Sequence, residues 1–309
     1  MSNGRPNFPA HLRIFPNAPR ETQDAWMRDS EQDIAQYGIA GRIWESAFLW
    51  AAYIENTTHT FDPPHSWLDA PVTLLELGAG VGTAGLATAS YLAHRSACPS
   101  EAHHVILTDL PEVESLLRRN VPWTPWAQAH VHVRPLAWGD AGHAEVILQT
   151  WTPTHILCSD LIYFPELLAP LLRSLLQITQ QAPNATVYLA YKIRSLTKEQ
   201  PFWTGLSAWF DLTWVQCTPS DPAAPWRPFG THASHFAYAP PCDETGAPLD
   251  DYFLFAAQRK EASLQWTCPD EDALLLQGLY MADGQPIPAP GTDAFEWILL
   301  SRSMDNDEL

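Results

Sequence analysis

The sequence predicts an α/β protein with a doubly wound, mostly parallel sheet of seven strands and an antiparallel final strand. Between residues 72 and 190, short apolar runs alternate with stretches of helical periodicity, which is typical of a parallel sheet with helices on both faces. The first run ends in a glycine-rich turn at 76–82, where open α/β sheets bind their ligands. Two later strand-like runs without a helical pattern between them provide an antiparallel pair.

The predicted elements follow in order along the chain. An apolar helix is expected just after Gly38 and Gly41, because apolar side chains recur at helical spacing over 43–54. Strands follow at 72–77, 105–109, 131–135, 156–159 and 186–190, with helices between them at 83–95, 112–120 and 167–180. The antiparallel strands are 210–217 and 252–257. The segment that joins them, 218–250, is rich in Pro, Asp, Ala and His and is expected to be a long functional or mobile loop.

The chain is expected to divide into three parts. Residues 1–36 mix Pro, Arg, Asn and Gln without a sustained period and predict an N-terminal arm or a short amphipathic element rather than a domain. Residues 37–259 contain the sheet and the glycine turn and are expected to form the catalytic domain. Residues 260–309 form a C-terminal extension, in which the strand-like run 295–300 competes with 252–257 for the last place in the sheet.

Composition and charge narrow the class of protein. The chain has 309 residues, of which 46% are hydrophobic, so it can bury a large core. Its net charge of −18 disfavours nucleic acid as a substrate and favours a basic partner. The five cysteines form no C-x-x-C pair and are odd in number, which predicts a reducing compartment: the cytoplasm, with the nucleus as the alternative. No apolar run approaches the roughly 18 residues of a membrane span, and no signal peptide is recognisable.

The glycine turn predicts a nucleotide cofactor without choosing its kind. Glycines at 78, 80 and 82 let the main chain approach a ligand closely and adopt positive φ. The spacing from Gly80 to Gly85 also matches the dinucleotide pattern G-x-G-x-x-G, which is a weak signal alone. Asp109 closes the second strand, where a carboxylate can accept hydrogen bonds from the ribose of either cofactor. Its alternative role is a cap for the next helix.

The fourth strand adds the most specific signal. It ends in Cys158-Ser159-Asp160-Leu161-Ile162-Tyr163, which puts a carboxylate and a phenol three positions apart at the carboxyl end of the strand. From about residue 37 to 260, the chain resembles the seven-strand protein methyltransferases once grouped as nicotinamide-methyltransferase-like, whose members are largely protein-lysine methyltransferases. The resemblance is carried, in order, by Gly41-x-x-Trp44 and by the motifs at 76–80, 108–109, 136–139 and 160–163. The run 188–194 also resembles the subgroup that methylates lysines of chaperones or translation elongation factors.

The resemblance implies S-adenosylmethionine as the cofactor and assigns roles to individual residues. The residues implied in cofactor binding are Trp44, Glu76, Gly78, Ala79, Gly80, Asp109, Trp138 and Ser159. Asp109 would hold the ribose, and Trp138 would lie near the adenine, for which an aromatic ring is also a suitable stacking surface. For Trp44, packing in an apolar helix is an equally open role, and the role of Ser159 rests wholly on the resemblance.

Asp160 and Tyr163 are the predicted catalytic residues. A lysine with an ordinary pKa near 10.4 is almost wholly charged at pH 7, and pairing with Asp160 would raise that pKa further. Asp160 is therefore expected to bind and orient the substrate lysine rather than act as a strong base. Tyr163 would form a wall of the lysine channel. The alternatives are a helix cap for Asp160 and simple packing for Tyr163.

The predicted function is an S-adenosylmethionine-dependent protein-lysine N-methyltransferase that acts on a basic protein, with translation elongation factor 1-alpha as the expected substrate. One alternative methylates a small molecule, such as a pyridine or another amine. Others are a non-catalytic binding module on the same fold and a nicotinamide-dependent oxidoreductase. No metal site is expected, because the histidine pairs at 103–104 and at 130 and 132 lack nearby ligands at suitable spacing.

Overall fold

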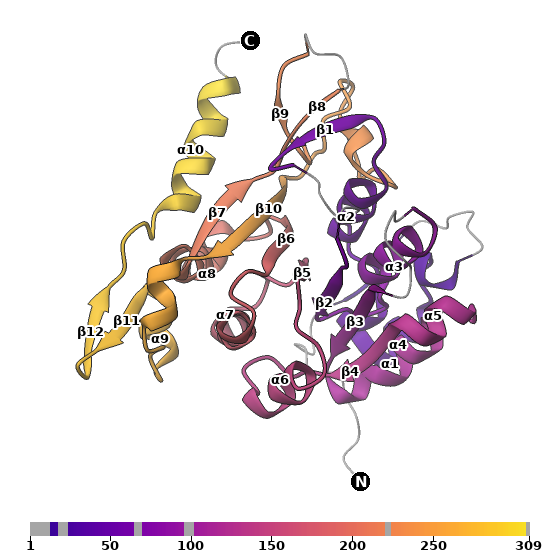
Figure 1. The fold of residues 1–309 in the computed structure, drawn as a ribbon. Coiled ribbons are helices and arrows are strands. Elements are labelled where there is room, and N and C mark those ends of the chain that lie inside the picture. Colours follow the sequence, from indigo (N-terminus) through magenta and orange to yellow (C-terminus); the bar gives the residue numbers. More distant parts are fainter. Residues whose placement is uncertain (1–12, 18–23, 65–69, 96–101, 220–223, 307–309) are drawn as a thin grey trace.

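The computed structural model describes residues 13–17, 24–64, 70–95, 102–219 and 224–306. Its centre is a seven-stranded sheet with the strand order β4-β3-β2-β5-β6-β10-β7 (Figure 1). The strands are β2 (Thr73–Leu77), β3 (His104–Asp109), β4 (Val131–Pro135), β5 (His155–Ser159), β6 (Thr186–Lys192), β7 (Phe210–Trp214) and β10 (Tyr252–Arg259). The strands from β2 to β6 pair in parallel, whereas β10 pairs antiparallel with both β6 and β7. The predicted fold class, with its antiparallel final strand, is confirmed.

Helices cover both faces of the sheet, as a doubly wound fold requires (Figure 1). One face carries α2 (Ser46–Glu55), α3 (Thr83–Arg95), α4 (Glu114–Asn120) and α5 (Pro125–His130), and the other α6 (Ala141–Leu148), α7 (Pro165–Gln181) and α8 (Leu196–Trp209). Successive side chains of β3 alternate between these layers. Val105 and Leu107 pack in the core under α2 and α3, and Ile106 packs in the core under α7 and α8.

The helix α7 shows how the local sequence specifies these elements. Pro165 occupies its first turn, where the missing N–H removes no helical hydrogen bond. The side chains of Leu168, Leu171, Leu172 and Leu175 recur at helical spacing and are buried. Burying this apolar stripe against the sheet stabilises α7. The helices α6 and α8 were not predicted from the sequence.

The predicted start of the first apolar helix is wrong. The helix α2 begins at Ser46, and Trp44 lies before it, after the short 3-10 helices η1 (Ala25–Met27) and η2 (Gly38–Gly41) and the helix α1 (Glu31–Tyr37). The indole N–H of Trp44 donates to the carbonyl of Ile39 at 3.1 Å. Trp44 is therefore held by the turn that leads into α2 and is not one of the core residues of that helix.

The strand predicted as an alternative at 295–300 is also wrong, because this segment lies inside the helix α10 (Ala294–Asn306). Phe295 is buried, Ile298 and Leu299 pack partly against the same core, and Trp297 and Leu300 are exposed. This one-sided burial has the helical spacing of three and four residues rather than the alternation of a strand.

The described part of the connection 218–250, which leaves out residues 220–223, contains two short elements of regular structure, and its function or mobility stays a prediction. The predicted strand 210–217 breaks after β7, and the chain continues into β8 (Gln216–Pro219). The strand β8 joins β1 (His59–Asp62) and β9 (Arg227–Pro228) in a separate three-stranded sheet, beside the 3-10 helix η5 (Ala233–His235). This small sheet lies at the top of Figure 1, beside α2.

The segment after β10 continues through η6 (Glu261–Gln265), α9 (Asp272–Leu276), the hairpin β11 (Leu279–Ala282) and β12 (Gln285–Pro288), and α10. Trp266 stacks on Tyr280 with ring centroids 4.2 Å apart, which fastens the hairpin to the preceding loop. The domain boundaries after residues 36 and 259 stay predictions.

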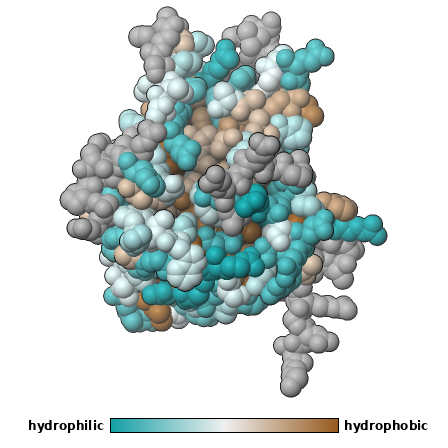
Figure 2. Space-filling view, turned by 90° about the vertical axis from the view of Figure 1, so that its right-hand side faces the viewer, coloured by the Kyte–Doolittle hydropathy of each residue, from teal (hydrophilic) through white to brown (hydrophobic). Residues whose placement is uncertain are grey.

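In Figure 2, hydrophilic side chains dominate one face of the molecule, and a hydrophobic patch lies exposed in its upper part. Within the described ranges, no helix is long and apolar enough to cross a membrane.

Candidate functional site

A cavity of about 890 Å³ opens at the carboxyl ends of β2, β3 and β5. Its volume lies within the range of roughly 300–1,000 Å³ that small-molecule sites usually have. All ten site residues predicted from the sequence line it: Trp44, Glu76, Gly78, Ala79, Gly80, Asp109, Trp138, Ser159, Asp160 and Tyr163. The structure therefore brings together side chains and backbone from five separate sequence motifs.

The glycine turn forms the floor of this cavity. Gly78 has φ 55° and Gly80 has φ 57°, so both occupy the left-handed region that favours glycine. A Cβ atom on Gly78 would lie only 2.7 Å from Cζ2 of Trp138. The backbone of the turn is fixed by the N–H of Ala79, which donates to the carbonyl of Thr108 at 2.8 Å. The turn and Trp138 are thus in direct contact, as expected of two parts of one binding site.

Asp109 is held by the same turn and by its own strand end. Its carboxylate accepts from the backbone N–H groups of Gly80 and Leu110, both at 2.7 Å. Burial raises the pKa of Asp109 to about 6, although these two hydrogen bonds act in the opposite direction. The following 3-10 helix η4 (Pro111–Val113) has no side-chain cap, so Asp109 does not cap it.

Glu76 is more deeply enclosed. One of its carboxylate oxygens accepts from the backbone N–H of Gly85 in α3 at 2.9 Å. Burial, opposed by this bond, raises the pKa of Glu76 to about 8. Glu76 therefore links β2 to the beginning of α3 and supports the turn between them.

Ser159 and Trp44 both line the cavity. The hydroxyl oxygen of Ser159 is buried and has no hydrogen-bond partner among the described residues. An orphaned hydroxyl beside a cavity is a ready contact for a ligand, because an unpaired buried polar group is costly. At Trp44, the guanidinium carbon of Arg42 lies 4.3 Å from the centroid of the indole ring.

Asp160 and Tyr163 follow β5 and lie near the cavity end that Trp44 borders. Asp160 has φ 62°, an uncommon conformation for a residue other than glycine and one that often marks functional sites. Its carboxylate does not cap α7, because no side chain caps that helix. Instead, both carboxylate oxygens accept from Arg194, at 2.6 and 2.7 Å. Burial raises the pKa of Tyr163, so its phenol stays protonated.

Arg194 is the residue at this end that sequence reasoning missed. It belongs to the run 188–194 that carries the narrower resemblance, but it was given no role. Its pairing with Asp160 spans 34 positions of the chain, so no local pattern reveals it. The only sequence signal was a cation placed shortly after a strand of the parallel sheet.

The histidines considered from the sequence lie at the opposite, amino-terminal end of the strands. Nδ1 of His104 lies 3.2 Å from Nε2 of His132, and Nδ1 of His103 accepts from the backbone N–H of Val72 at 3.0 Å. Burial lowers the pKa of His132 to about 4, so it is neutral near pH 7. Among the described residues, these histidines form no group of three potential metal ligands.

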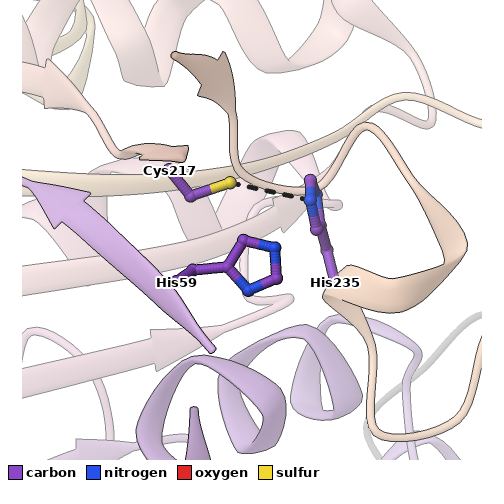
Figure 3. Close-up of side chains that lie close together, drawn as sticks. All are labelled: His59, Cys217 and His235. Carbon is purple, nitrogen blue, oxygen red and sulfur yellow. Dashed lines mark hydrogen bonds between the residues drawn. The ribbon is translucent and has the colours of Figure 1, made fainter. Parts of the chain in front are cut away.

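A different trio, His59, Cys217 and His235, does bring three potential ligand atoms within 4.8 Å of one another (Figure 3). Nε2 of His235 lies 3.6 Å from Sγ of Cys217. However, the backbone N–H of Gly230 donates to Nδ1 of His235 at 3.0 Å, so the hydrogen of the neutral ring sits on Nε2. The nitrogen that faces the sulfur is thus a donor rather than a free ligand. We assign the trio to fastening β1, β8 and η5 together.

Comparison with known proteins places these residues in a family. A family model described as lysine methyltransferase matches residues 24–209. The protein-lysine N-methyltransferase EFM6 of Saccharomyces cerevisiae is 26% identical over 53% of this chain and 68% of its own length. Protein N-lysine methyltransferase METTL21A of Mus musculus is 26% identical over 61% of this chain and 76% of its length. EEF1A lysine methyltransferase 3 of Xenopus tropicalis is 25% identical over 52% of this chain and 61% of its length.

Two of the solved structures to which the chain is similar are described as methyltransferases. Human N-acetylserotonin methyltransferase, in complex with S-adenosylmethionine, has a TM-score of 0.35 and 11% identity over 69% of this chain and 50% of that one. A Planctomyces limnophilus O-methyltransferase family 2 protein has a TM-score of 0.38 and 13% identity, covering 68% of this chain and 56% of that one.

Proposed function

The chain belongs to the lysine methyltransferase family, and we propose that it is an S-adenosylmethionine-dependent protein-lysine N-methyltransferase. The observation that carries the proposal is the single cavity lined by the glycine turn, Asp109, Trp138, Asp160 and Tyr163. The curated relatives support the protein-lysine specificity, because their names describe protein-lysine methyltransferases.

The residues present fit S-adenosylmethionine. The positive-φ glycines leave room beside the backbone, and the unpaired Ser159 hydroxyl can bond a polar ligand. We propose that Asp109 accepts hydrogen bonds from the ribose and that the Trp138 ring contacts the adenine. Trp44, Glu76 and the backbone of 78–80 complete the proposed cofactor contacts.

The proposed reaction is a direct displacement that needs a neutral amine. When bound, S-adenosylmethionine supplies a methyl group on a positively charged sulfur. A neutral lysine nitrogen held in this cavity would accept that methyl group on its lone pair, the C–S electron pair would stay with sulfur, and the methylated lysine would then release one proton. Asp160 and Tyr163, at the end of β5, are proposed to orient this amine, and the other residues of the cavity hold the reacting groups in line.

Translation elongation factor 1-alpha is the proposed protein substrate. The name of the Xenopus tropicalis relative supports this choice, as does the net charge of −18, which attracts a basic protein. We propose the cytoplasm as the location, because the proposed substrate acts in translation.

The test combines S-adenosylmethionine carrying a tritiated methyl group, the full-length chain, and either cell extract or purified elongation factor 1-alpha. We expect a labelled protein band and, in a parallel reaction with unlabelled S-adenosylmethionine, a gain of about 14 Da per methyl group on a lysine located by mass spectrometry. Label found only in small molecules would overturn the proposal. The variant Asp160→Ala should bind S-adenosylmethionine but turn over slowly. Normal turnover in that variant would refute the role of Asp160.

A further inference from the structure

The carboxylate of Asp160 forms an ion pair with Arg194 of the same chain. The two guanidinium nitrogens of Arg194 donate to its two oxygens in a bidentate pair, at 2.6 and 2.7 Å. The side chain of Asp160 is fully buried, whereas that of Arg194 is 25% exposed. Because parallel N–H···O bonds to a carboxylate are among the strongest hydrogen bonds in proteins, this pair is expected to persist.

Arg194 is itself positioned by its surroundings. Its guanidinium carbon lies 5.2 Å from the centroid of the Trp44 ring, at the cavity wall. Its backbone N–H and that of Ser195 donate to the buried carboxylate of Glu199, at 3.3 and 2.8 Å. Burial disfavours the charge of Arg194, but Asp160, together with the charges of Glu45 and Glu199, raises the pKa of Arg194 above its usual value. The arginine is therefore a fixed, permanent cation.

This cation lies within electrostatic reach of the proposed reaction site. The cavity is lined by the three residues on which Arg194 acts. Arg194 pairs with Asp160, lies over the ring of Trp44 and affects the pKa of Tyr163 through its charge. Burial and the charge of Asp109 raise the pKa of Tyr163, the charge of Arg194 lowers it, and that of Asp160 raises it. The charges of Arg194 and Asp160 therefore act in opposite directions on the pKa of Tyr163.

On the proposed methyltransferase function, we infer that Arg194 is a positioning and specificity residue that makes the site select an uncharged substrate amine. A lysine ammonium is a single point charge and cannot replace the two parallel bonds that Arg194 makes to Asp160. With the carboxylate neutralised, an incoming ammonium meets the sulfonium and the guanidinium, two like charges that favour its neutral form. Asp160 then acts through Arg194 rather than as a direct counter-ion of the substrate.

The first test measures binding alone and needs no protein substrate. S-adenosylmethionine and S-adenosylhomocysteine differ by one methyl group and one positive charge on sulfur, so the ratio of their dissociation constants reports the charge near that sulfur. In Arg194→Gln the charge of Asp160 is unbalanced, and the preference should move at least threefold toward S-adenosylmethionine. In Asp160→Asn the charge of Arg194 is unbalanced, and the preference should move toward S-adenosylhomocysteine.

Two further variants separate charge from structure. Arg194→Lys keeps the cation and should keep the ratio within about twofold of the wild type, because like charges act alike at this distance. Arg118→Gln removes an arginine from a surface pair with Glu114 on α4 and should leave the ratio unchanged. Thermal unfolding of each variant identifies any that fails to fold. If Arg194→Gln is lost in this way, Asp160→Asn and Arg194→Lys still decide the outcome.

The second test is the pH profile of lysine methylation. Arg194→Gln should move the acidic limb of kcat/KM to higher pH by at least one unit, because the freed Asp160 stabilises the ammonium form. The double variant with Asp160→Asn should move it back. An unchanged binding ratio in both single variants, or an acidic limb that stays in place, overturns the role of Arg194. Wild-type protein that binds neither ligand would instead overturn the proposed function itself.

Discussion

Binding of S-adenosylmethionine should be coupled to the ionisation of Asp109. In the structure, burial raises the pKa of Asp109 to about 6, so the carboxyl group is half protonated near pH 6. A ribose that donates hydrogen bonds to this group favours its ionised form and lowers its pKa in the complex. Binding must therefore release protons in this pH range, and affinity must rise as pH increases through 6.

The size of the effect follows from that pKa. We take Asp109 to be ionised in the complex at every pH in this range. The apparent affinity is then proportional to the fraction of the free protein in which Asp109 is already ionised. With a pKa of about 6, this predicts about tenfold weaker binding at pH 5 than at pH 7. Glu76, whose pKa is raised to about 8, stays protonated over this interval and contributes little.

Isothermal titration calorimetry between pH 5 and pH 7, in buffers with different ionisation enthalpies, measures both quantities. At pH 6 we expect release of about half a proton per ligand bound. Asp109→Asn should bind weakly at every pH without this dependence, because an amide does not ionise. Asp140→Asn, which keeps a good cap on the exposed end of α6, should behave like the wild type. Equal affinities at pH 5 and pH 7, or a pH dependence that survives in Asp109→Asn, would refute the reasoning.

Three other outcomes follow from the structure. Gly85→Ala would place a Cβ 2.3 Å from the carboxylate of Glu76, so urea unfolding should show a loss of about 1–3 kcal/mol, whereas Gly142→Ala, whose Cβ would lie 3.3 Å from the exposed Asp140 side chain, should cost less. Burial lowers the pKa of His235 from 6.5 to about 4, so the unfolded chain takes up the proton first and stability falls as pH drops below 6.5. His235 alone should account for about 2.5 kcal/mol of the change between pH 7 and pH 4.5, measured in urea unfolding as the difference between the wild type and His235→Asn. Finally, added salt should raise the KM for a basic protein substrate more than it weakens the binding of S-adenosylmethionine, because a basic protein brings more positive charge to the net charge of −18 than this singly cationic ligand does.

The parts of the site that the sequence predicted are those encoded by neighbouring residues. The glycine turn, Asp109 and the pair Asp160 and Tyr163 each follow an apolar run, and the carboxyl ends of parallel strands meet at one edge of a sheet. All of them line the same cavity. Their positions therefore follow from alternation and strand polarity alone, although their roles are still to be tested.

The parts that could not be predicted depend on contacts between distant residues. His59 in β1 pairs with Pro219 in β8, and neither short segment shows a partner in its own sequence. The apolar run 295–300 is compatible with a strand or a helix, and only its packing against the core selects the helix. The role proposed for Arg194 likewise depends on its contact with Asp160, which only the folded chain shows.

Charge acts in opposite ways at long and short range in this molecule. The net charge of −18 attracts a basic protein from a distance. At the cavity, however, the carboxyl groups of Glu76, Asp109 and Asp160 are each occupied by donors from the protein itself: two by backbone N–H groups and the third by Arg194. A free carboxylate there would hold a lysine as its unreactive ammonium, because pairing raises the pKa of the amine. The acidic surface can therefore gather a cationic substrate while the site itself favours the neutral amine that accepts a methyl group.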